Sequence, residues 1–185
     1  MPLVDVIVCS RHRDFVREVE RGFDAALALQ VVLEAQGLPV DVKGYRGGSD
    51  TEPYVLLSVG SSPDKSQFSK LVVGAVDLLG RERTGRLIAT LLGLSTPPDL
   101  KYVTKSEDLL PLLQFGSANA VVLSEQEAQH LKALSKLDLR VLPLATRLGL
   151  PALSLRSEAG RRIVRTAVEG LDADTKRRLG VDTWR

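Results

Sequence analysis

Apolar runs and amphipathic stripes alternate along almost the whole chain. The run "VDVIVCS" at 4–10 predicts a buried strand, and apolar residues at helical spacing predict a helix over 14–36 that ends before Gly37. Within this stripe, Gly22 is a position where the helix can be interrupted. A short strand is predicted over 39–45, followed by the linker "RGGSDTEP" at 46–53, where we place a boundary.

The alternation restarts at Tyr54 and continues to the C-terminus. We expect strands at 54–60, 70–79, 100–104, 118–124, 139–145 and 150–156. We expect helices at 82–92, 106–116, 125–135 and 157–171. Strands separated by helices pair in parallel through helical crossovers. The pattern therefore predicts an α/β fold with three layers, a mostly parallel sheet with helices on both faces.

The composition is typical of a folded, soluble domain. The 185 residues are 44% hydrophobic and 26% charged, and 25 basic residues face 23 acidic ones. No cluster concentrates this small positive excess, so we expect neither a nucleic-acid partner nor membrane insertion. Cys9 is the one cysteine, which excludes an intramolecular disulfide and a cysteine-based zinc site. No metal or other cofactor is expected.

The N-terminus "MPLVDVIVCS" lacks a basic region before its short apolar run, and such a region marks an export signal. As written, the sequence predicts a cytoplasmic protein. A chain from which an export signal had been removed would look the same, so the periplasm stays open as the alternative.

The segment 71–87 nearly spells a nucleotide-binding P-loop. Gly80 and Gly85 have the spacing of that motif, between a predicted strand and a predicted helix. The next two residues are Arg86 and Leu87, where the motif requires Lys and then Ser or Thr to hold phosphate and magnesium. The sequence therefore argues against a nucleotide triphosphatase.

The same loop has the outline of a simpler site. A helix N-terminus presents unpaired N–H groups and the positive end of its dipole, which favours an anion or a polar ligand. Arg81, Arg83 and the Thr84 hydroxyl would add donors, and the loop follows a strand at the edge where open α/β sheets bind ligands. The alternative is a strand-to-helix turn in which both arginines are solvated.

Other candidates for chemistry are weaker. Ser61 and Ser62 follow a strand, but no spacing assigns either of them a histidine partner, which favours a capped turn. Asp77 lies in an apolar strand, where a carboxylate is costly unless it is paired, and it could orient Arg81 or Arg83. No set of acid, base and nucleophile can be named, so we expect no enzyme activity.

From Tyr54 to Arg185 the ordered elements resemble the second lobe and C-terminus of type 2 periplasmic binding proteins, most closely the phosphate, phosphite and phosphonate substrate-binding group of ABC importers. The segments that carry the resemblance are "YVLLSVGSS", "SKLVVGAVDLLG", "RERTGRLIATLLGL", "YVTKSEDLLPLLQFGSANAVVLS" and the closing "LPALSLRSEAGRRIVRTAVEGLDADTKRRLGVDTWR". The resemblance implies a lobe that binds a small ligand without chemical turnover.

Two departures from that family change the expectation. The family's ligand loop is rich in Ser, Thr and Gly, whereas here only Thr84 and Gly85 fit, with Arg81 and Arg83 in place of small polar residues. Residues 1–50 supply a β-α-β segment, about half of a complete first lobe. We therefore expect a reduced first lobe at 1–50 and one binding-protein-like lobe at 54–185, and a homodimer that covers the exposed face stays open.

A second resemblance covers only the first sixty residues. The elements "VDVIVCS", the long helix, "GLPVDVKGY" and "PYVLLSVG" are similar to the anticodon-binding domain of class II aminoacyl-tRNA synthetases. The expected basic groove is missing. This resemblance leaves an RNA-binding domain as a minor alternative.

Together these inferences predict a binding protein for a small anionic or polar ligand, part of an ABC importer with a permease partner or a derivative of one. The expected contact surface is formed by the loops at 58–64, 77–85 and 124–127. The expected ligand-binding residues are Ser61, Ser62, Arg81, Arg83, Thr84, Gly85 and Ser124. A protein-interaction or regulatory module that kept the lobe without a ligand is the alternative.

Overall fold

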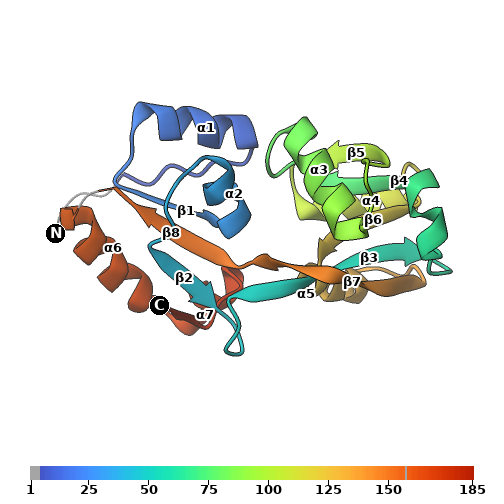
Figure 1. Ribbon diagram of the computed structural model, residues 1–185. Coiled ribbons are helices and arrows are strands. Elements are labelled where there is room, and N and C mark those ends of the chain that lie inside the picture. Colours follow the sequence, from blue (N-terminus) through green and yellow to red (C-terminus); the bar gives the residue numbers. More distant parts are fainter. Residues whose placement is uncertain (1–4, 157) are drawn as a thin grey trace.

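The computed structural model describes residues 5–156 and 158–185 and places them in two lobes joined by two neighbouring strands (Figure 1). The first lobe is built from both ends of the chain. Its elements are α1 (His12–Arg21), β1 (Ala25–Leu29), α2 (Gln30–Ala35), β2 (Val42–Tyr45), β8 (Pro151–Leu155), α6 (Glu158–Glu169), α7 (Ala173–Arg178) and β9 (Thr183–Trp184). The strand order is β1-β8-β2-β9, and each of these pairings is antiparallel.

Apolar side chains cover both faces of this first sheet. On one face Leu33 of α2 packs against Ala26 and Ala152, with Phe15 of α1 beside them. On the other face, α6 and the C-terminal segment join the buried cluster Val42, Leu150, Leu153, Leu155, Val168, Val181 and Trp184. The C-terminal residues are therefore part of the core of the first lobe.

The second lobe is the continuous stretch from β3 to β7. Its elements are β3 (Thr51–Val59), η1 (Lys65–Lys70), β4 (Val72–Val76), α3 (Arg81–Leu92), β5 (Asp99–Val103), η2 (Ser106–Asp108), α4 (Leu109–Gln114), β6 (Ala120–Ser124), α5 (Glu125–Leu134) and β7 (Leu139–Gly149). The strand order is β5-β4-β6-β3-β7. Strand β4 pairs in parallel with β5 and β6, whereas β3 pairs antiparallel with both β6 and β7.

Helices cover both faces of the second sheet. Ile88, Leu91 and Leu92 of α3 pack on one face, as the apolar stripe of the sequence predicts. Residues of α4 and α5, among them Leu109 and Leu131, pack on the other face. The expected α/β class with three layers is confirmed, although parallel pairing is limited to β4, β5 and β6.

The chain crosses between the lobes twice, after β2 and after β7. The register of β3 with β7 starts with Thr51 opposite Gly149, and the backbone N–H of Leu150 donates to Asp50 O at 2.8 Å just beyond it. A Cβ atom at Gly149 would lie 2.7 Å from Gln30 Cβ at the start of α2. Because no side chain fits there, glycine lets the first lobe approach the connection closely.

The structure corrects the expected division of the chain. A boundary near residue 50 coincides with the first crossing, but residues 54–185 do not form one lobe, because β8 pairs with β1 and β2. The first lobe is thus completed by the C-terminal segment. Strand pairing between distant segments leaves no mark in local periodicity, which explains why the sequence pattern missed it.

The N-terminal prediction is also wrong in part. Residues 5–9 of the expected strand form no regular element, and residue 4 lies outside the described part of the chain. The expected helix over 14–36 is interrupted at Gly22, whose φ of 102° is readily adopted only by glycine. The apolar run that follows becomes β1, with Leu27 opposite Leu153 of β8. Within residues 5–156 and 158–185, no helix combines the length and apolar character needed to span a bilayer.

The C-terminal contribution to the first lobe can be tested with Trp184, which is 6% exposed. We expect Trp184→Ala to lower the free energy of unfolding by about 3–5 kcal/mol, because it removes a large buried side chain. Phe115→Ala is the matched control: this aromatic residue is 81% exposed, so its loss should change stability by less than about 0.5 kcal/mol. Urea unfolding followed by circular dichroism measures both, and equal effects would contradict the packing of the C-terminal segment.

Candidate functional site between the two lobes

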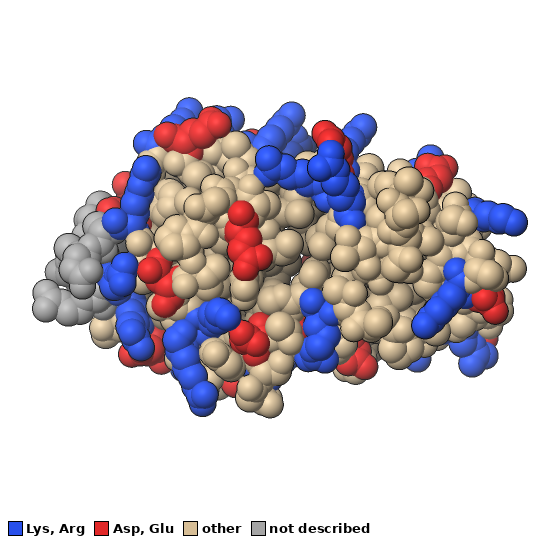
Figure 2. Space-filling model, viewed as in Figure 1, with Lys and Arg blue, Asp and Glu red and all other residues tan. Residues whose placement is uncertain are grey.

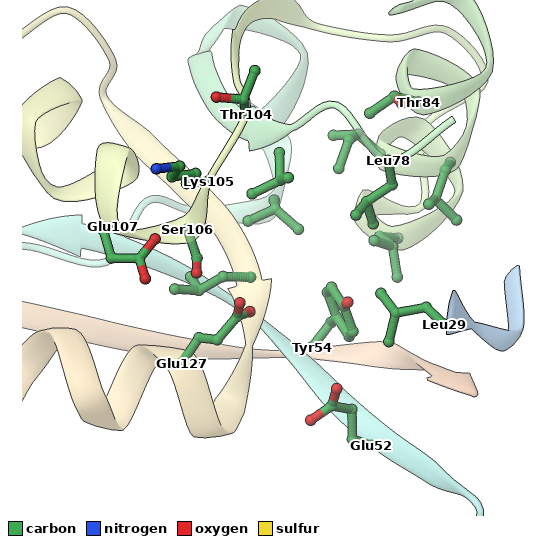
Figure 3. A pocket seen from close by; sticks show the side chains of 16 residues that line it. Leu29, Glu52, Tyr54, Leu78, Thr84, Thr104, Lys105, Ser106, Glu107 and Glu127 are labelled. Atoms are coloured by element: carbon green, nitrogen blue, oxygen red, sulfur yellow. The ribbon is translucent and has the colours of Figure 1, made fainter. Parts of the chain in front are cut away.

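A cavity of about 520 Å³ lies where the two lobes meet (Figure 3). This volume is within the range typical of small-molecule sites. Leu29, at the end of β1, comes from the first lobe, and the remaining lining residues come from the second. The cavity is lined by Leu29, Glu52, Tyr54, Val76, Leu78, Thr84, Leu87, Ile88, Leu91, Thr104, Lys105, Ser106, Glu107, Val122, Leu123 and Glu127.

The strand directions explain why these residues converge. Because β4, β5 and β6 run in parallel, their carboxyl ends lie at one edge of the sheet, where Val76 and Leu123 line the cavity and Thr104 follows β5. Strand β3 enters the lobe at this same edge because it runs antiparallel to β6. Its first residues, including Glu52 and Tyr54, therefore face the cavity.

The polar end of the cavity carries more negative than positive charge. Glu52, Glu107 and Glu127 line it, with Lys105 as the one basic lining residue. Glu127 belongs to a capping box at the start of α5, in which its Oε2 accepts from the Ser124 N–H at 3.1 Å and from the Ser124 hydroxyl at 3.0 Å. In the part of the chain that the structure describes, no ion pair neutralises Glu127 or Glu107.

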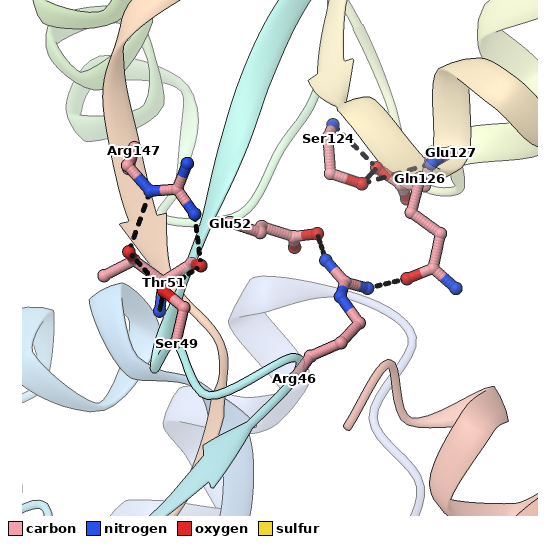
Figure 4. A network of polar contacts seen from close by, with 8 residues as sticks. All are labelled: Arg46, Ser49, Thr51, Glu52, Ser124, Gln126, Glu127 and Arg147. Carbon is pink, nitrogen blue, oxygen red and sulfur yellow. Dashed lines mark hydrogen bonds and ion pairs between the residues drawn. The ribbon is translucent and has the colours of Figure 1, made fainter. Parts of the chain in front are cut away.

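Glu52 forms an ion pair with Arg46, a residue that does not line the cavity. Arg46, just after β2, donates to Glu52 Oε2 at 2.6 Å and also to the amide oxygen of Gln126 on α5 (Figure 4). Burial raises the pKa of Glu52, and so does the charge of Glu127, while the hydrogen bond and charge of Arg46 lower it. One guanidinium thus connects the first lobe, the connecting strand β3 and the second lobe.

Tyr54 stands between the carboxylates and the apolar wall. The residue is only 6% exposed, and its hydroxyl points into the cavity (Figure 3). Burial, followed by the charges of Glu127 and Glu52, raises its pKa, so the phenol stays protonated at neutral pH. Among the described residues, no side chain or backbone group forms a hydrogen bond with this hydroxyl. It is an unused donor and acceptor inside the site.

The Thr84 hydroxyl is not free to bind a ligand, because both of its hydrogen bonds are made within its own loop. Thr84 is fully buried, its hydroxyl donates to Asp77 Oδ1 at 2.8 Å, and it accepts from the Leu79 N–H at 2.9 Å. Asp77 lies just beyond the end of β4 and is paired, but with Thr84 and not with an arginine. These bonds close the loop 77–84 on itself.

The other expected residues of this loop do not line the cavity. Arg83 is exposed and donates from Nη1 to the carbonyl oxygen of Ala35 at 2.7 Å, which links α3 to the end of α2 in the first lobe. Arg81 lies over the Tyr102 ring, 5.9 Å from its centroid. Gly85 is buried where a Cβ atom would lie 3.2 Å from the Tyr102 hydroxyl. Neither arginine is therefore among the residues that line the cavity.

The expected serines fall into two groups. Ser124 is buried beside the cavity, and its hydroxyl is used in the capping box with Glu127. Ser61 and Ser62 are exposed after the far end of β3, at the edge of the sheet opposite Thr84. The loop at 58–64 therefore does not join the loops at 77–85 and 124–127, because β3 runs against the direction of β4 and β6.

Sequence reasoning missed the residues that dominate the polar end. Glu52 and Tyr54 sit in and beside "RGGSDTEP", where glycine and proline indicate a linker, yet strand β3 starts at Thr51. The capping pattern from Ser124 to Glu127 was a usable signal for a carboxylate at the start of α5. Leu29 could not be placed, because its approach depends on how the lobes dock.

The lining of the cavity offers acidic, hydroxyl, basic and apolar groups. Its lining contains carboxylates, hydroxyls, one lysine and apolar side chains, and it contains neither histidine nor cysteine. In residues 5–156 and 158–185, no group of three His, Cys, Asp or Glu side chains is arranged to hold a metal ion. These groups can neutralise charge, exchange hydrogen bonds and exclude water around an apolar body.

No protein-family model and no curated protein matches this sequence. Solved structures do match the fold. The chain is similar to XAC2383 from Xanthomonas citri bound to ATP, with a TM-score of 0.72, 15% identity and coverage of 98% of this chain and 78% of that one. It is also similar to a binding-protein component of an ABC phosphonate transporter from Pseudomonas aeruginosa, with a TM-score of 0.67, 10% identity and coverage of 96% and 68%.

A third similar structure is AbpA, an amino acid ABC transporter substrate-binding protein from Streptococcus pneumoniae bound to L-arginine. Its TM-score is 0.60, with 14% identity and coverage of 91% of this chain and 70% of that one. At these identities the comparisons establish the fold: it is that of type 2 periplasmic substrate-binding proteins of ABC transporters. They do not single out the phosphate and phosphonate group.

The structural task of Thr84 gives a direct test. We expect Thr84→Val to lower the free energy of unfolding by about 1–3 kcal/mol, because the buried Leu79 N–H loses its acceptor. Thr84→Ser should retain most of the stability. Thr90→Val on the same helix is the control, since its exposed hydroxyl only donates to Arg86 O. A Thr84→Val protein as stable as Thr90→Val would show that the loop 77–84 is not held by this hydroxyl.

Proposed function

We propose that this chain is a non-catalytic binding protein for a small polar ligand, which it holds in the cavity between its lobes. The observation that carries the proposal is the cavity itself, with a buried, unpartnered Tyr54 hydroxyl aimed into it. A pocket with an apolar wall and a few convergent polar groups is the usual form of a small-molecule site.

The proposal extends to transport. The fold is shared with substrate-binding proteins of ABC transporters, and in this fold two lobes joined by a narrow connection close around the ligand. We propose that the chain works as the substrate-binding component of an ABC importer with a permease partner, or as a derivative of one. The permease partner and a periplasmic location both depend on that role.

The RNA-binding alternative has no support in the fold. Residues 5–60 do not form a separate domain, because β1 and β2 pair with β8 from the other end of the chain. On the face shown in Figure 2, Lys and Arg side chains lie in separate groups with Asp and Glu among them. Binding of nucleic acid backbone requires a continuous basic surface, which this face does not offer.

The test is a thermal-shift and calorimetric panel of L-arginine, 2-aminoethylphosphonate, ethanesulfonate, inorganic phosphate and ATP. At least one compound should raise the melting temperature, because a ligand that binds only the folded state stabilises it. In Leu78→Trp, which fills the cavity wall, this shift should disappear. In Val59→Trp, which alters an exposed position at the far end of β3, it should persist.

Two results would contradict the proposal. One is a ligand whose shift survives in Leu78→Trp, because it would bind outside the cavity. The other is no shift with any compound together with a stable oligomer in light scattering, which would favour the interaction or regulatory module.

A further inference from the structure

We propose that the cavity selects a positively charged nitrogen, an ammonium or guanidinium group, carried on a small apolar body. This inference rests on the proposed function and names its ligand class. The charged group would lie between Glu127 and the Tyr54 hydroxyl, with Glu52 nearby, and the apolar body would lie against the leucines of the opposite wall.

The charge of the lining is the first argument. Three carboxylates and one lysine ammonium line the cavity. The net charge of the lining is therefore negative, even though the Arg46 guanidinium, which lies outside the lining, neutralises Glu52. Glu127 receives only the uncharged donors of Ser124. An opposite charge within about 4–6 Å stabilises such a carboxylate, whereas an anionic ligand would face like charge.

Tyr54 is the second, independent argument. Buried polar groups are almost always hydrogen-bonded, because leaving one unpaired costs stability. Tyr54 is only 6% exposed, and its hydroxyl forms no hydrogen bond among the described residues and is directed into the cavity (Figure 3). Its oxygen can accept a hydrogen bond from an ammonium or guanidinium N–H. A ligand that donates there would satisfy this hydroxyl.

The apolar part of the cavity lining indicates the chemistry of the rest of the ligand. Leu78, Leu87, Ile88 and Leu91 form an apolar wall on the α3 side, and Leu29 adds an apolar contact from the first lobe. Burial of an aliphatic chain against this wall is favourable because it removes apolar surface from water. The cavity volume of about 520 Å³ fits a small molecule and excludes a long chain.

A cationic ligand differs from the anionic ligand that the sequence favoured. That expectation depended on Arg81 and Arg83, and neither lines the cavity, since Arg83 bonds to Ala35 O and Arg81 lies over Tyr102. The hydroxyl of Thr84 is also closed to a ligand. Because these donors do not face the cavity, the carboxylates determine the charge of the ligand, which we expect to be positive.

The test uses three probes with the same six-carbon chain: hexylammonium, 1-hexanol and hexanoate. We expect calorimetry to show hexylammonium binding at least about tenfold tighter than hexanoate, with hexanol between them, because a tenfold ratio corresponds to about 1.4 kcal/mol. Glu127→Gln should weaken hexylammonium binding about tenfold, because the ammonium loses the opposite charge of the carboxylate, and should leave hexanol binding unchanged. Tyr54→Phe should also weaken hexylammonium.

The control variant is Glu125→Gln, on the same helix and outside the cavity lining. Gln at position 127 still completes a capping box, so Glu127→Gln keeps the start of α5 intact. Hexanoate binding as tightly as hexylammonium would overturn the inference while leaving a small-ligand function in place. Equal affinity of Glu127→Gln and Glu125→Gln for hexylammonium, or no binding of hexylammonium at all, would also overturn it.

Discussion

The antiparallel pairing of β3 with β7 is the constraint on which the rest of the structure depends. These strands carry the chain into and out of the second lobe, and their register brings Thr51 opposite Gly149 and Glu52 opposite Leu148. Arg147 reinforces the start of this ladder by donating from Nε to the Thr51 hydroxyl at 2.9 Å and from Nη2 to Thr51 O at 2.8 Å (Figure 4). Both lobes are therefore held to one short, well-bonded connection.

The position of the cavity follows from that connection. The strand that enters the second lobe runs against β6, so its first residues arrive at the edge where β4, β5 and β6 end. Side chains from the connection, from the strand ends and from the first lobe then surround one space. Arg46 adds a link between all three parts through Glu52 and Gln126, which couples the charge inside the cavity to the contact between the lobes.

Contacts across the lobes lie on two sides of this space. Arg83 reaches Ala35 O from the N-terminal turn of α3, and Arg46 reaches Gln126 at the start of α5. Each of these two bonds joins an arginine of one lobe to one uncharged acceptor of the other, so neither contributes more than a modest free energy. Such contacts can break and reform without loss of the fold, which suits a site that must admit and release a small molecule.

The sequence was most informative where local periodicity decides the structure. The apolar stripe of α3 and its end at Gly93 were predicted, because each depends on residues a few positions apart. The capping box from Ser124 to Glu127 is an equally local signal, which sequence reasoning missed. The short run Ala25–Leu29 could not be assigned, since its strand character comes from β8, more than a hundred residues away.

The site shows the same contrast between what local sequence determines and what contacts between distant residues determine. A loop rich in Arg and Gly at the start of α3 looked like an anion site, but only tertiary packing determines that Thr84 bonds to Asp77 and that Arg83 turns to Ala35. Glu52 and Tyr54 were hidden by the proline between them, because a bulge in the ladder accommodates Pro53 within a strand. The polar end of the cavity could be assigned only once the two lobes were placed together.

The central claim is that a ligand occupies the space between the lobes, and hydrogen–deuterium exchange with a stabilising ligand tests it most directly. Amides in the segments 27–31, 52–56, 77–84 and 104–107 should exchange more slowly with the ligand than without it, because these segments border the cavity from both lobes. Protection confined to the loop 58–64, or to one lobe alone, would contradict the account.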